Sequence, residues 1–215
     1  MRMQQDLFIE VDVAGSGRLR LPGFLSLPAN AQQIVVFVHG SGSSRHSPRN
    51  QRVARALNEG GLGTLLFDLL MPNEAEDRAN VFDIDLLAER VHVARSWLAT
   101  APETGQLNVG LFGASTGAAA ALTSAARDPD RLSAIVSRGG RPDLAESSLP
   151  HVQAPTLFIV GALDHQVVQL NESAARMLRC EHRIEVVPGA THVFEEPGTL
   201  DIVAELAATW FIDHP

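Results

Sequence analysis

The segment Gly113-Ala114-Ser115-Thr116-Gly117 decides the fold of this 215-residue chain. It follows the apolar run at residues 109–112 and leads into the alanine-rich stretch 118–122, which is the pattern of a strand, a sharp turn and a helix. A serine on such a turn has a strained backbone, and the residues on either side need almost no side chain. The turn would place the hydroxyl at the end of a sheet, where the N-terminal amides of the helix favour developing negative charge.

Units of strand and helix alternate along the rest of the chain. Two strands are expected first, at residues 7–13 and 18–28, with a turn at 14–17 between them. Apolar runs predict six further strands, at 34–38, 63–68, 108–112, 132–137, 156–160 and 183–187. Helical spacing predicts helices at 48–60, 81–101, 116–127, 166–178 and 199–212, with a short segment near 143–147. This order predicts a single α/β domain spanning residues 1–215, with a mostly parallel sheet covered by helices on both faces.

Composition narrows the class of protein. Hydrophobic residues make up 45% of the chain and charged residues 20%, which is ordinary for a soluble globular protein. No apolar run is long enough to span a membrane, and the N-terminus lacks the pattern of a secretory signal, so a cytoplasmic location is expected. The formal net charge of −8 argues against general nucleic-acid binding, which needs a basic surface.

The rarer residue types exclude several kinds of chemistry. Cys180 is the single cysteine, which rules out an internal disulfide and a cysteine-based metal cluster. The sequence contains no lysine, and this removes serine–lysine catalysis and Schiff-base chemistry. Histidines and carboxylates do not show the spacing of metal ligands, so neither a metal nor another cofactor is expected.

Three loops that carry a serine, an aspartate and a histidine are expected at one edge of this sheet. Ser115, Asp164 and His192 each follow a predicted strand within a few residues, and the carboxyl ends of parallel strands meet at one edge. His192 would accept the serine proton and return it to the leaving group, and Asp164 would orient the imidazole. Asp164 also suits the N-cap of the helix that follows it, and Asp68, at the end of a neighbouring strand, is the weaker alternative acid.

A glycine-rich loop, His39-Gly40-Ser41-Gly42-Ser43-Ser44, follows the strand at residues 34–38. Its glycines would let backbone amides approach a ligand closely. We expect the amides of Ser41 and Thr116 to form an oxyanion hole, one from this loop and one from the residue after the nucleophile. His39 is expected to shape the loop rather than to act as a base.

Basic side chains flank the predicted site on two loops, one after the strand at 34–38 and one after the strand at 132–137. They are Arg45, His46, Arg49, Arg138 and Arg141. Two interpretations stay open for them. They are either a clamp for an acidic substrate, or surface groups paired with local carboxylates such as Asp143. The pair Glu195-Glu196, just after His192, is interpreted as a solvated acidic turn.

Taken together, the motifs resemble those of the α/β-hydrolase superfamily, and within it the dienelactone-hydrolase-like group of small hydrolases. The matching segments span most of the chain and are His39-Gly40, Gly113-x-Ser115-x-Gly117, Gly161-x-x-Asp164 and Gly189-x-x-His192. The resemblance implies an eight-stranded sheet whose second strand is antiparallel. Dienelactone hydrolases use a cysteine as the nucleophile, whereas this chain has Ser115, which moves the expectation toward general carboxylic esters.

The resemblance also bears on the access to the site. Larger relatives insert a helical lid between the strands at 132–137 and 156–160, and the segment here is short, which implies an open site. The sequence therefore predicts a serine hydrolase that cleaves small carboxylic esters through an acyl-enzyme, working as a monomer or homodimer on a small-molecule substrate. An acyltransferase that uses the same triad, and a non-catalytic binding module on a hydrolase fold, are the alternatives.

Overall fold

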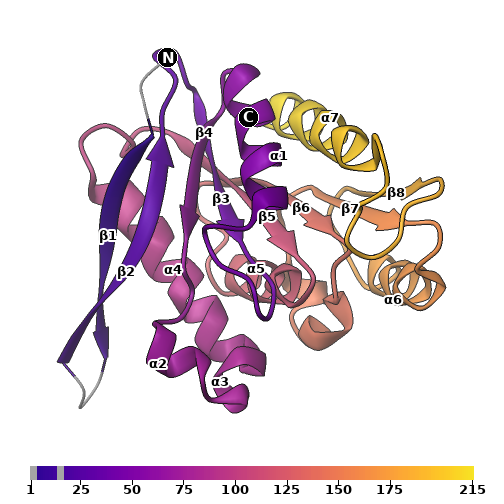
Figure 1. Cartoon of the computed structure of the whole chain (residues 1–215), viewed down its shortest axis with the longest axis horizontal. Coiled ribbons are helices and arrows are strands. Elements are labelled where there is room, and N and C mark those ends of the chain that lie inside the picture. The colour runs from indigo at the N-terminus through magenta and orange to yellow at the C-terminus, as the bar shows by residue number, and fades with distance from the viewer. Residues whose placement is uncertain (1–3, 14–16) are drawn as a thin grey trace.

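Eight strands form one sheet in the computed structural model, which describes residues 4–13 and 17–215. The strand order is β1-β2-β4-β3-β5-β6-β7-β8, with β2 antiparallel to β1 and β4 and the later strands parallel (Figure 1). The strands are β1 Gln5–Val13, β2 Gly17–Ser26, β3 Gln33–Val38, β4 Gly63–Phe67, β5 Asn108–Ala114, β6 Leu132–Arg138, β7 Thr156–Gly161 and β8 His182–Val187. The predicted strands and the antiparallel second strand are confirmed. Residues 14–16 of the predicted turn lie outside the described residues.

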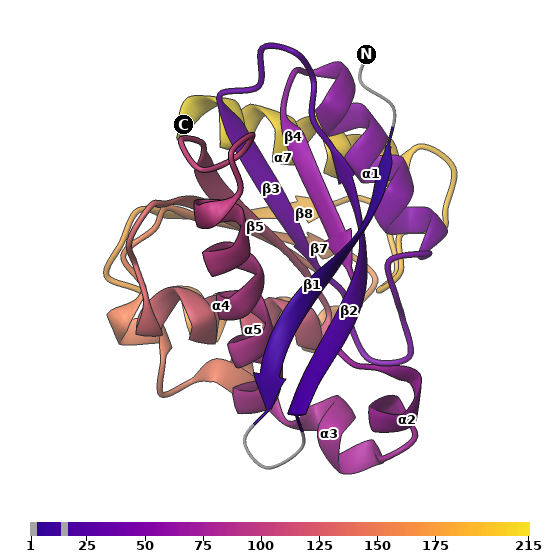
Figure 2. The same ribbon diagram turned by 90° about the vertical axis from the view of Figure 1, so that its left-hand side faces the viewer.

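Helices cover both faces of the sheet, as the sequence predicts (Figure 1). One face carries α1 Pro48–Glu59 and α7 Thr199–Asp213. The other face carries α4 Ile84–Thr100, α5 Thr116–Arg127 and α6 His165–Ala175. Figure 2, seen from the hairpin side, shows β1 and β2 as the outermost strands at this edge of the sheet.

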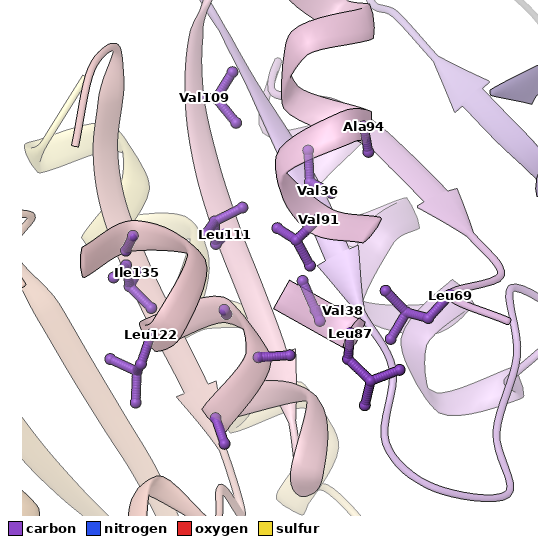
Figure 3. Close-up of a cluster of buried hydrophobic side chains, with 14 of the residues drawn as sticks. Val36, Val38, Leu69, Leu87, Val91, Ala94, Val109, Leu111, Leu122 and Ile135 are labelled. Atoms are coloured by element: carbon purple, nitrogen blue, oxygen red, sulfur yellow. The ribbon is translucent and has the colours of Figure 1, made fainter. Parts of the chain in front are cut away.

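The largest buried cluster lies between the sheet and the helices α4 and α5. Figure 3 shows Val36 of β3 and Leu111 of β5 beneath Val91 of α4 and Leu122 of α5, and all four side chains are fully buried. Each such burial stabilises the fold by about 1.5–3 kcal/mol. Residues 118–121 of α5 are alanines with no exposed surface, so this helix packs closely on the sheet directly after the predicted nucleophile.

The helix predicted at 81–101 starts later than expected. A short helix, α3 (Arg78–Phe82), ends at Asp83, and the Asp83 side chain accepts a hydrogen bond of 2.9 Å from the Leu86 amide. This contact caps the N-terminus of α4, because an aspartate satisfies an amide that has no partner within the helix. The helical spacing of the sequence therefore predicted one helix across the end of α3 and the whole of α4, whereas the Asp83 cap separates the two.

Two further connections contain short helical turns, of which the sequence pattern indicated only the segment near residues 143–147. The short helix α2 (Pro72–Ala75) precedes α3, and four residues are too few to show a helical pattern. Between β6 and β7 the chain forms two short 3-10 turns, η1 (Pro142–Ala145) and η2 (Leu149–His151), in place of a helical lid.

The turn between β5 and α5 has the strained geometry that its sequence predicts. Ser115 has φ 51° and ψ −123°, a left-handed backbone that non-glycine residues rarely adopt. A Cβ on Gly117 would overlap the carbonyl oxygens of Val38 and His39, and a Cβ on Gly113 would lie 2.5 Å from the Ala118 Cα. Both glycines are therefore required by close backbone packing around the serine.

Backbone hydrogen bonds hold Ser115 in this conformation from the neighbouring strand. The Ser115 amide donates to the carbonyl oxygen of Arg138 at 3.2 Å, and the Arg141 amide donates to the carbonyl oxygen of Ser115 at 3.0 Å. The end of β6 and the loop after it thus hold the backbone on both sides of Ser115.

His39 joins the glycine-rich loop to the loop after β4. Its Nδ1 lies 3.0 Å from the carbonyl oxygen of Gly40, and its Nε2 accepts a hydrogen bond of 3.1 Å from the Leu69 amide. Only a neutral imidazole with its proton on Nδ1 can make both contacts. Burial lowers the pKa of His39 below its usual 6.5, which favours this neutral form.

Gly117→Ala is expected to lower the free energy of unfolding by about 3 kcal/mol or more, because the added methyl group overlaps two backbone carbonyls that cannot move independently. Urea unfolding measures this loss. Gly60→Ala is the matched control, since Gly60 has φ −76° and a Cβ there meets only ordinary contacts. Equal stability of the two variants would contradict the packing described for the turn.

The neutral His39 predicts a dependence of stability on pH. Below pH 6.5 the unfolded chain binds a proton at this position that the folded protein does not, so stability falls as the pH falls. The slope from this one group is at most about 1.4 kcal/mol per pH unit. The contribution of His39 is isolated by comparing the unfolding free energies of wild type and His39→Gln between pH 7.5 and pH 5.5. Parallel pH profiles would show that His39 is not held neutral.

Candidate active site

Ser115, His192 and Asp164 come together at the carboxyl edge of the sheet. The Ser115 Oγ lies 3.3 Å from His192 Nε2, and His192 Nδ1 lies 2.7 Å from Asp164 Oδ2. A carboxylate can only accept, so Nδ1 donates to Asp164 and Nε2 is left to accept the serine proton. The geometry therefore supports a nucleophile, a base and a group that orients the base.

Asp164 and Asp68, the two candidate acids, make different contacts. Asp164 occupies the N-cap position of α6, but its side chain makes no capping hydrogen bond and contacts His192 instead. Asp68 accepts from the backbone amide of Arg45 at 2.6 Å and also forms an ion pair with the Arg45 guanidinium. Asp68 is thus engaged with the loop after β3, and Asp164 is the carboxylate that reaches the histidine.

A hydrogen bond from the loop backbone to a carboxylate stabilises the loop that carries His192, and the sequence analysis did not predict this contact. Glu196 accepts a hydrogen bond of 3.2 Å from the Thr191 amide, and hydrogen bonding by the Thr191 side chain, more than by this amide, lowers the pKa of Glu196. Phe194 in the same loop has φ 56° and a buried ring. Glu196 therefore helps to fix the turn on which the histidine stands, where the sequence had suggested only a solvated acidic turn.

The glycine-rich loop packs directly on the predicted nucleophile. A Cβ on Gly40 would lie 2.9 Å from the Ala114 carbonyl oxygen and 3.0 Å from the Ser115 Cβ. The Ser41 amide donates to the Thr116 Oγ1 at 2.9 Å. Thr116 is the first residue of α5, where an amide has no partner within the helix. The two amides expected in an oxyanion hole thus lie on adjoining segments, linked by the threonine hydroxyl.

A pocket of about 630 Å³ opens beside the glycine-rich loop. One wall consists of residues 39–44, and the other is formed by the loop after β4 with α2, α3 and Leu87 of α4. Leu69, Leu70, Val81 and Phe82 give this second wall an apolar surface. The loop after β4 and the helix α3 therefore supply the apolar side of the pocket next to the site.

The basic residues that flank the site differ in their partners. The Arg141 guanidinium makes a two-point contact with Asp143, at 2.8 and 2.7 Å, which raises the pKa of Arg141. Arg45 is paired with Asp68, and the exposed His46 packs its ring edge on Phe24. Arg45 and Arg141 are therefore each paired with a local carboxylate. Arg138 has no carboxylate partner among the described residues.

Residues 4–13 and 17–215 contain neither a cluster of metal ligands nor a membrane-spanning helix. No group of three or more histidine, cysteine, aspartate or glutamate side chains in this part of the chain is placed to hold a metal ion. Within the same residues, none of the helices has the length and apolar character needed to cross a lipid bilayer.

Solved structures share this fold over nearly the whole chain. A crystal structure of a dienelactone hydrolase from Anabaena variabilis is 50% identical, with a TM-score of 0.92 and 98% coverage of both chains. Est1E from Butyrivibrio proteoclasticus is 14% identical with a TM-score of 0.80, covering 96% of this chain and 98% of that one, a likeness in fold alone.

The sequence of this chain is similar to two curated proteins and matches the model of one protein family. Two proteins of Mycobacterium tuberculosis, each named "Putative phosphoribosyl transferase", are 57% identical over 205 residues. The match covers 95% of this chain and 46% of theirs, so the chain spans about half the length of these relatives. The model of the dienelactone hydrolase family matches residues 21–210. With this match over most of its length, the chain belongs to the dienelactone hydrolase family and has the α/β-hydrolase fold.

Proposed function

We propose that the protein is a serine esterase that cleaves small carboxylic esters through an acyl-enzyme. The observation that carries the proposal is the continuous line of contacts from Ser115 through His192 to Asp164, at 3.3 and 2.7 Å. Family membership supports a hydrolase, and these contacts supply the nucleophile and the base that ester cleavage needs.

In the first half of the reaction, Ser115 Oγ attacks the ester carbonyl while its proton passes to His192 Nε2. The new bond gives a tetrahedral intermediate with a negative oxygen. This intermediate collapses when the bond to the alcohol breaks, and His192 returns its proton to the departing oxygen. Asp164 accepts a hydrogen bond from Nδ1 throughout and stabilises the transient imidazolium.

The negative oxygen of the intermediate would be held by the amides of Ser41 and Thr116. Preformed donors of this kind are effective because they need no reorganisation during the reaction. In the structure the single N–H of Ser41 donates to the Thr116 hydroxyl, so this hydroxyl holds the loop before substrate binds and would share that N–H with the negative oxygen when the intermediate forms. Its own hydrogen is then free to turn toward the same negative oxygen.

In the second half, water takes the place of the alcohol. His192 removes a proton from this water, the resulting oxygen attacks the acyl carbon, and the bond to Ser115 Oγ breaks as the proton returns to the serine. An open approach to the site admits water, and the segment between β6 and β7 forms only short turns. This favours hydrolysis over transfer of the acyl group to another alcohol.

The apolar pocket of about 630 Å³ beside the glycine-rich loop is the proposed place for a small organic group of the ester. Its size falls within the range of ordinary small-molecule sites. The curated relatives are named for phosphoribosyl transfer, and about half of their length lies outside the match.

A series of p-nitrophenyl esters, from acetate to laurate, tests the proposal. Wild type is expected to hydrolyse the short esters best. Ser115→Ala is expected to lower kcat/KM by at least about 10³-fold, and Asp164→Asn by about 10³- to 10⁴-fold, because the imidazole loses its useful tautomer.

Ser173→Ala, an exposed serine on α6, is the matched control and should keep wild-type rates. Activity that survives in Ser115→Ala would show that another residue is the nucleophile. A protein without activity on any of these esters would support the binding-module alternative.

Thr116→Val tests the role of the hydroxyl separately from that of the backbone amide. The variant keeps the shape of the side chain and the amide, but the Ser41 amide loses its partner. We expect kcat on p-nitrophenyl acetate to fall about 10-fold with little change in KM, and Thr116→Ser to recover most of the rate. A kcat that rises in Thr116→Val would show instead that the hydroxyl competes with the substrate for the Ser41 amide.

A further inference from the structure

Asn171 is a fully buried polar residue of α6, the helix that begins directly after Asp164. Its side-chain nitrogen donates two hydrogen bonds, one to the carbonyl oxygen of Val167 at 2.8 Å and one to the carbonyl oxygen of Gly140 at 3.0 Å. Both partners are oxygens, so the side chain must turn its nitrogen toward them, and each of its two hydrogens serves one bond. The bond to Val167 stays within α6, whereas the bond to Gly140 joins α6 to the loop after β6.

An asparagine at this buried position costs stability. Burial of a polar group is unfavourable unless the group is hydrogen-bonded, and Asn171 Oδ1 has no partner among the described residues. An apolar side chain of this size would avoid that cost, but it could not donate to the Gly140 carbonyl. The contact with Gly140 is therefore what the asparagine adds to this helix.

The loop that Asn171 contacts contains two consecutive glycines. Gly139 has φ 51°, and a Cβ on Gly140 would overlap a side-chain oxygen of β6, so both positions need glycine. Glycines also leave the backbone more conformational freedom than other residues do. The Gly139 amide donates to the carbonyl oxygen of Ile159 in β7 at 2.8 Å, which ties the first glycine to the sheet. The Asn171 side chain ties the second glycine to α6.

The contact at Gly140 leads to the nucleophile turn through two peptide groups. Gly140 and Arg141 share one planar peptide group. Asn171 donates to the carbonyl oxygen of this group, and the N–H of the same group donates to the Ser115 carbonyl oxygen at 3.0 Å. Ser115 and Thr116 share the next peptide group, whose N–H is the proposed oxyanion donor. Hydrogen bonds therefore run in a line from Asn171 to the place where the negative oxygen of the intermediate develops.

This line affects the Thr116 N–H in two ways. A hydrogen bond to the carbonyl oxygen of a peptide group polarises that group and strengthens its N–H as a donor, by about 10–30% per bond. The direction of the N–H is also fixed, because the Ser115 carbonyl accepts from the Ala118 amide at 3.1 Å as well as from Arg141. A donor that is aimed beforehand stabilises developing charge without reorganisation.

We propose that Asn171 is a positioning residue, which acts through these two peptide groups on the Thr116 N–H that holds the oxyanion. The inference rests on the proposed esterase function, since that function assigns this N–H to the negative oxygen. Asn171 acts on the direction and strength of the donor, and the donor binds the transition state more tightly than the ester. Its removal is therefore expected to change kcat rather than KM.

Asn171→Leu keeps the approximate size of the side chain and removes its donors. We expect kcat on p-nitrophenyl acetate, per active site titrated with a fluorophosphonate, to fall about 5- to 10-fold with little change in KM. Asn171→Ser provides a second variant if Asn171→Leu does not fold. A serine hydroxyl on a helix bonds to the carbonyl four residues earlier, so it replaces the Val167 contact but not the Gly140 contact, and the same fall in kcat is expected.

Thr104→Val is the matched control. Thr104 lies just before β5, at the end of this strand away from Ser115, and only 1% of its surface is exposed. Its hydroxyl donates to the carbonyl oxygen of Leu98 at 2.7 Å, so the variant also loses a buried hydrogen bond from a side chain to the backbone. It should keep the wild-type kcat. An equal fall of kcat in Thr104→Val, or an unchanged kcat in both Asn171 variants, would overturn the positioning role.

Inhibition by a trifluoromethyl ketone reports the oxyanion directly. Ser115 Oγ adds to the ketone carbon, its proton passes to His192 Nε2, and the ketone oxygen becomes negative, as in the tetrahedral intermediate. We expect Ki to rise in the Asn171 variants by about the factor by which kcat falls, and to stay constant in Thr104→Val. A fall in kcat without a rise in Ki would show a structural effect and contradict the inference.

Nitrogen-15 chemical shifts test the line of hydrogen bonds without catalysis. We expect the amide resonances of Arg141 and, more weakly, of Thr116 to move upfield in Asn171→Leu and to stay in place in Thr104→Val, because the peptide groups become less polarised. An unchanged Thr116 resonance would refute the inference even where wild type hydrolyses esters. If both resonances move but wild type hydrolyses no ester, the proposed esterase function fails and the coupling of Asn171 to Thr116 stands.

Discussion

The left-handed backbone of Ser115 is the constraint on which the rest of the site depends. A non-glycine residue in this region costs about 1–3 kcal/mol and persists only where the surroundings enforce it. Here Gly117 lets α5 approach the carbonyls at the end of β3, and hydrogen bonds with the backbone of Arg138 and Arg141 hold the chain on both sides of Ser115. The same packing sets the glycine-rich loop against the serine, so the turn and the expected oxyanion hole are built together.

Parallel strands explain why residues distant in sequence meet at this turn. Ser115, Asp164 and His192 stand on loops after β5, β7 and β8, and these strands end at one edge of the sheet. Each loop is then fixed by local contacts, such as the Glu196 carboxylate on the histidine loop. The sheet brings the three loops close to one another, and these local contacts set the distances between the side chains of Ser115, His192 and Asp164. The sheet does not determine which charges are paired, because Arg45 and Arg141 have carboxylate partners whereas Arg138 has none among the described residues.

The sequence predicted the features that local pattern determines. Strands and helices with strong periodicity were found close to their observed limits, and the order of serine, aspartate and histidine after strands predicted their convergence. Short elements were missed, because α2 and α3 have too few residues for a pattern and Asp83 separates α3 from α4 without breaking the helical spacing. The partners of the arginines could not be predicted either. Arg45 is paired with Asp68 and Arg138 with no carboxylate among the described residues, and both depend on contacts between distant segments.

Mass spectrometry of the protein after reaction with a fluorophosphonate tests the central claim most directly, since this reagent reports an activated serine independently of any natural substrate. The account predicts one adduct per chain, located on Ser115 by peptide mapping, and a reaction that slows greatly when His192 is replaced by alanine. An unmodified protein, or an adduct on a different serine, would contradict the proposal that the Ser115 turn, its histidine and its aspartate form a working nucleophile.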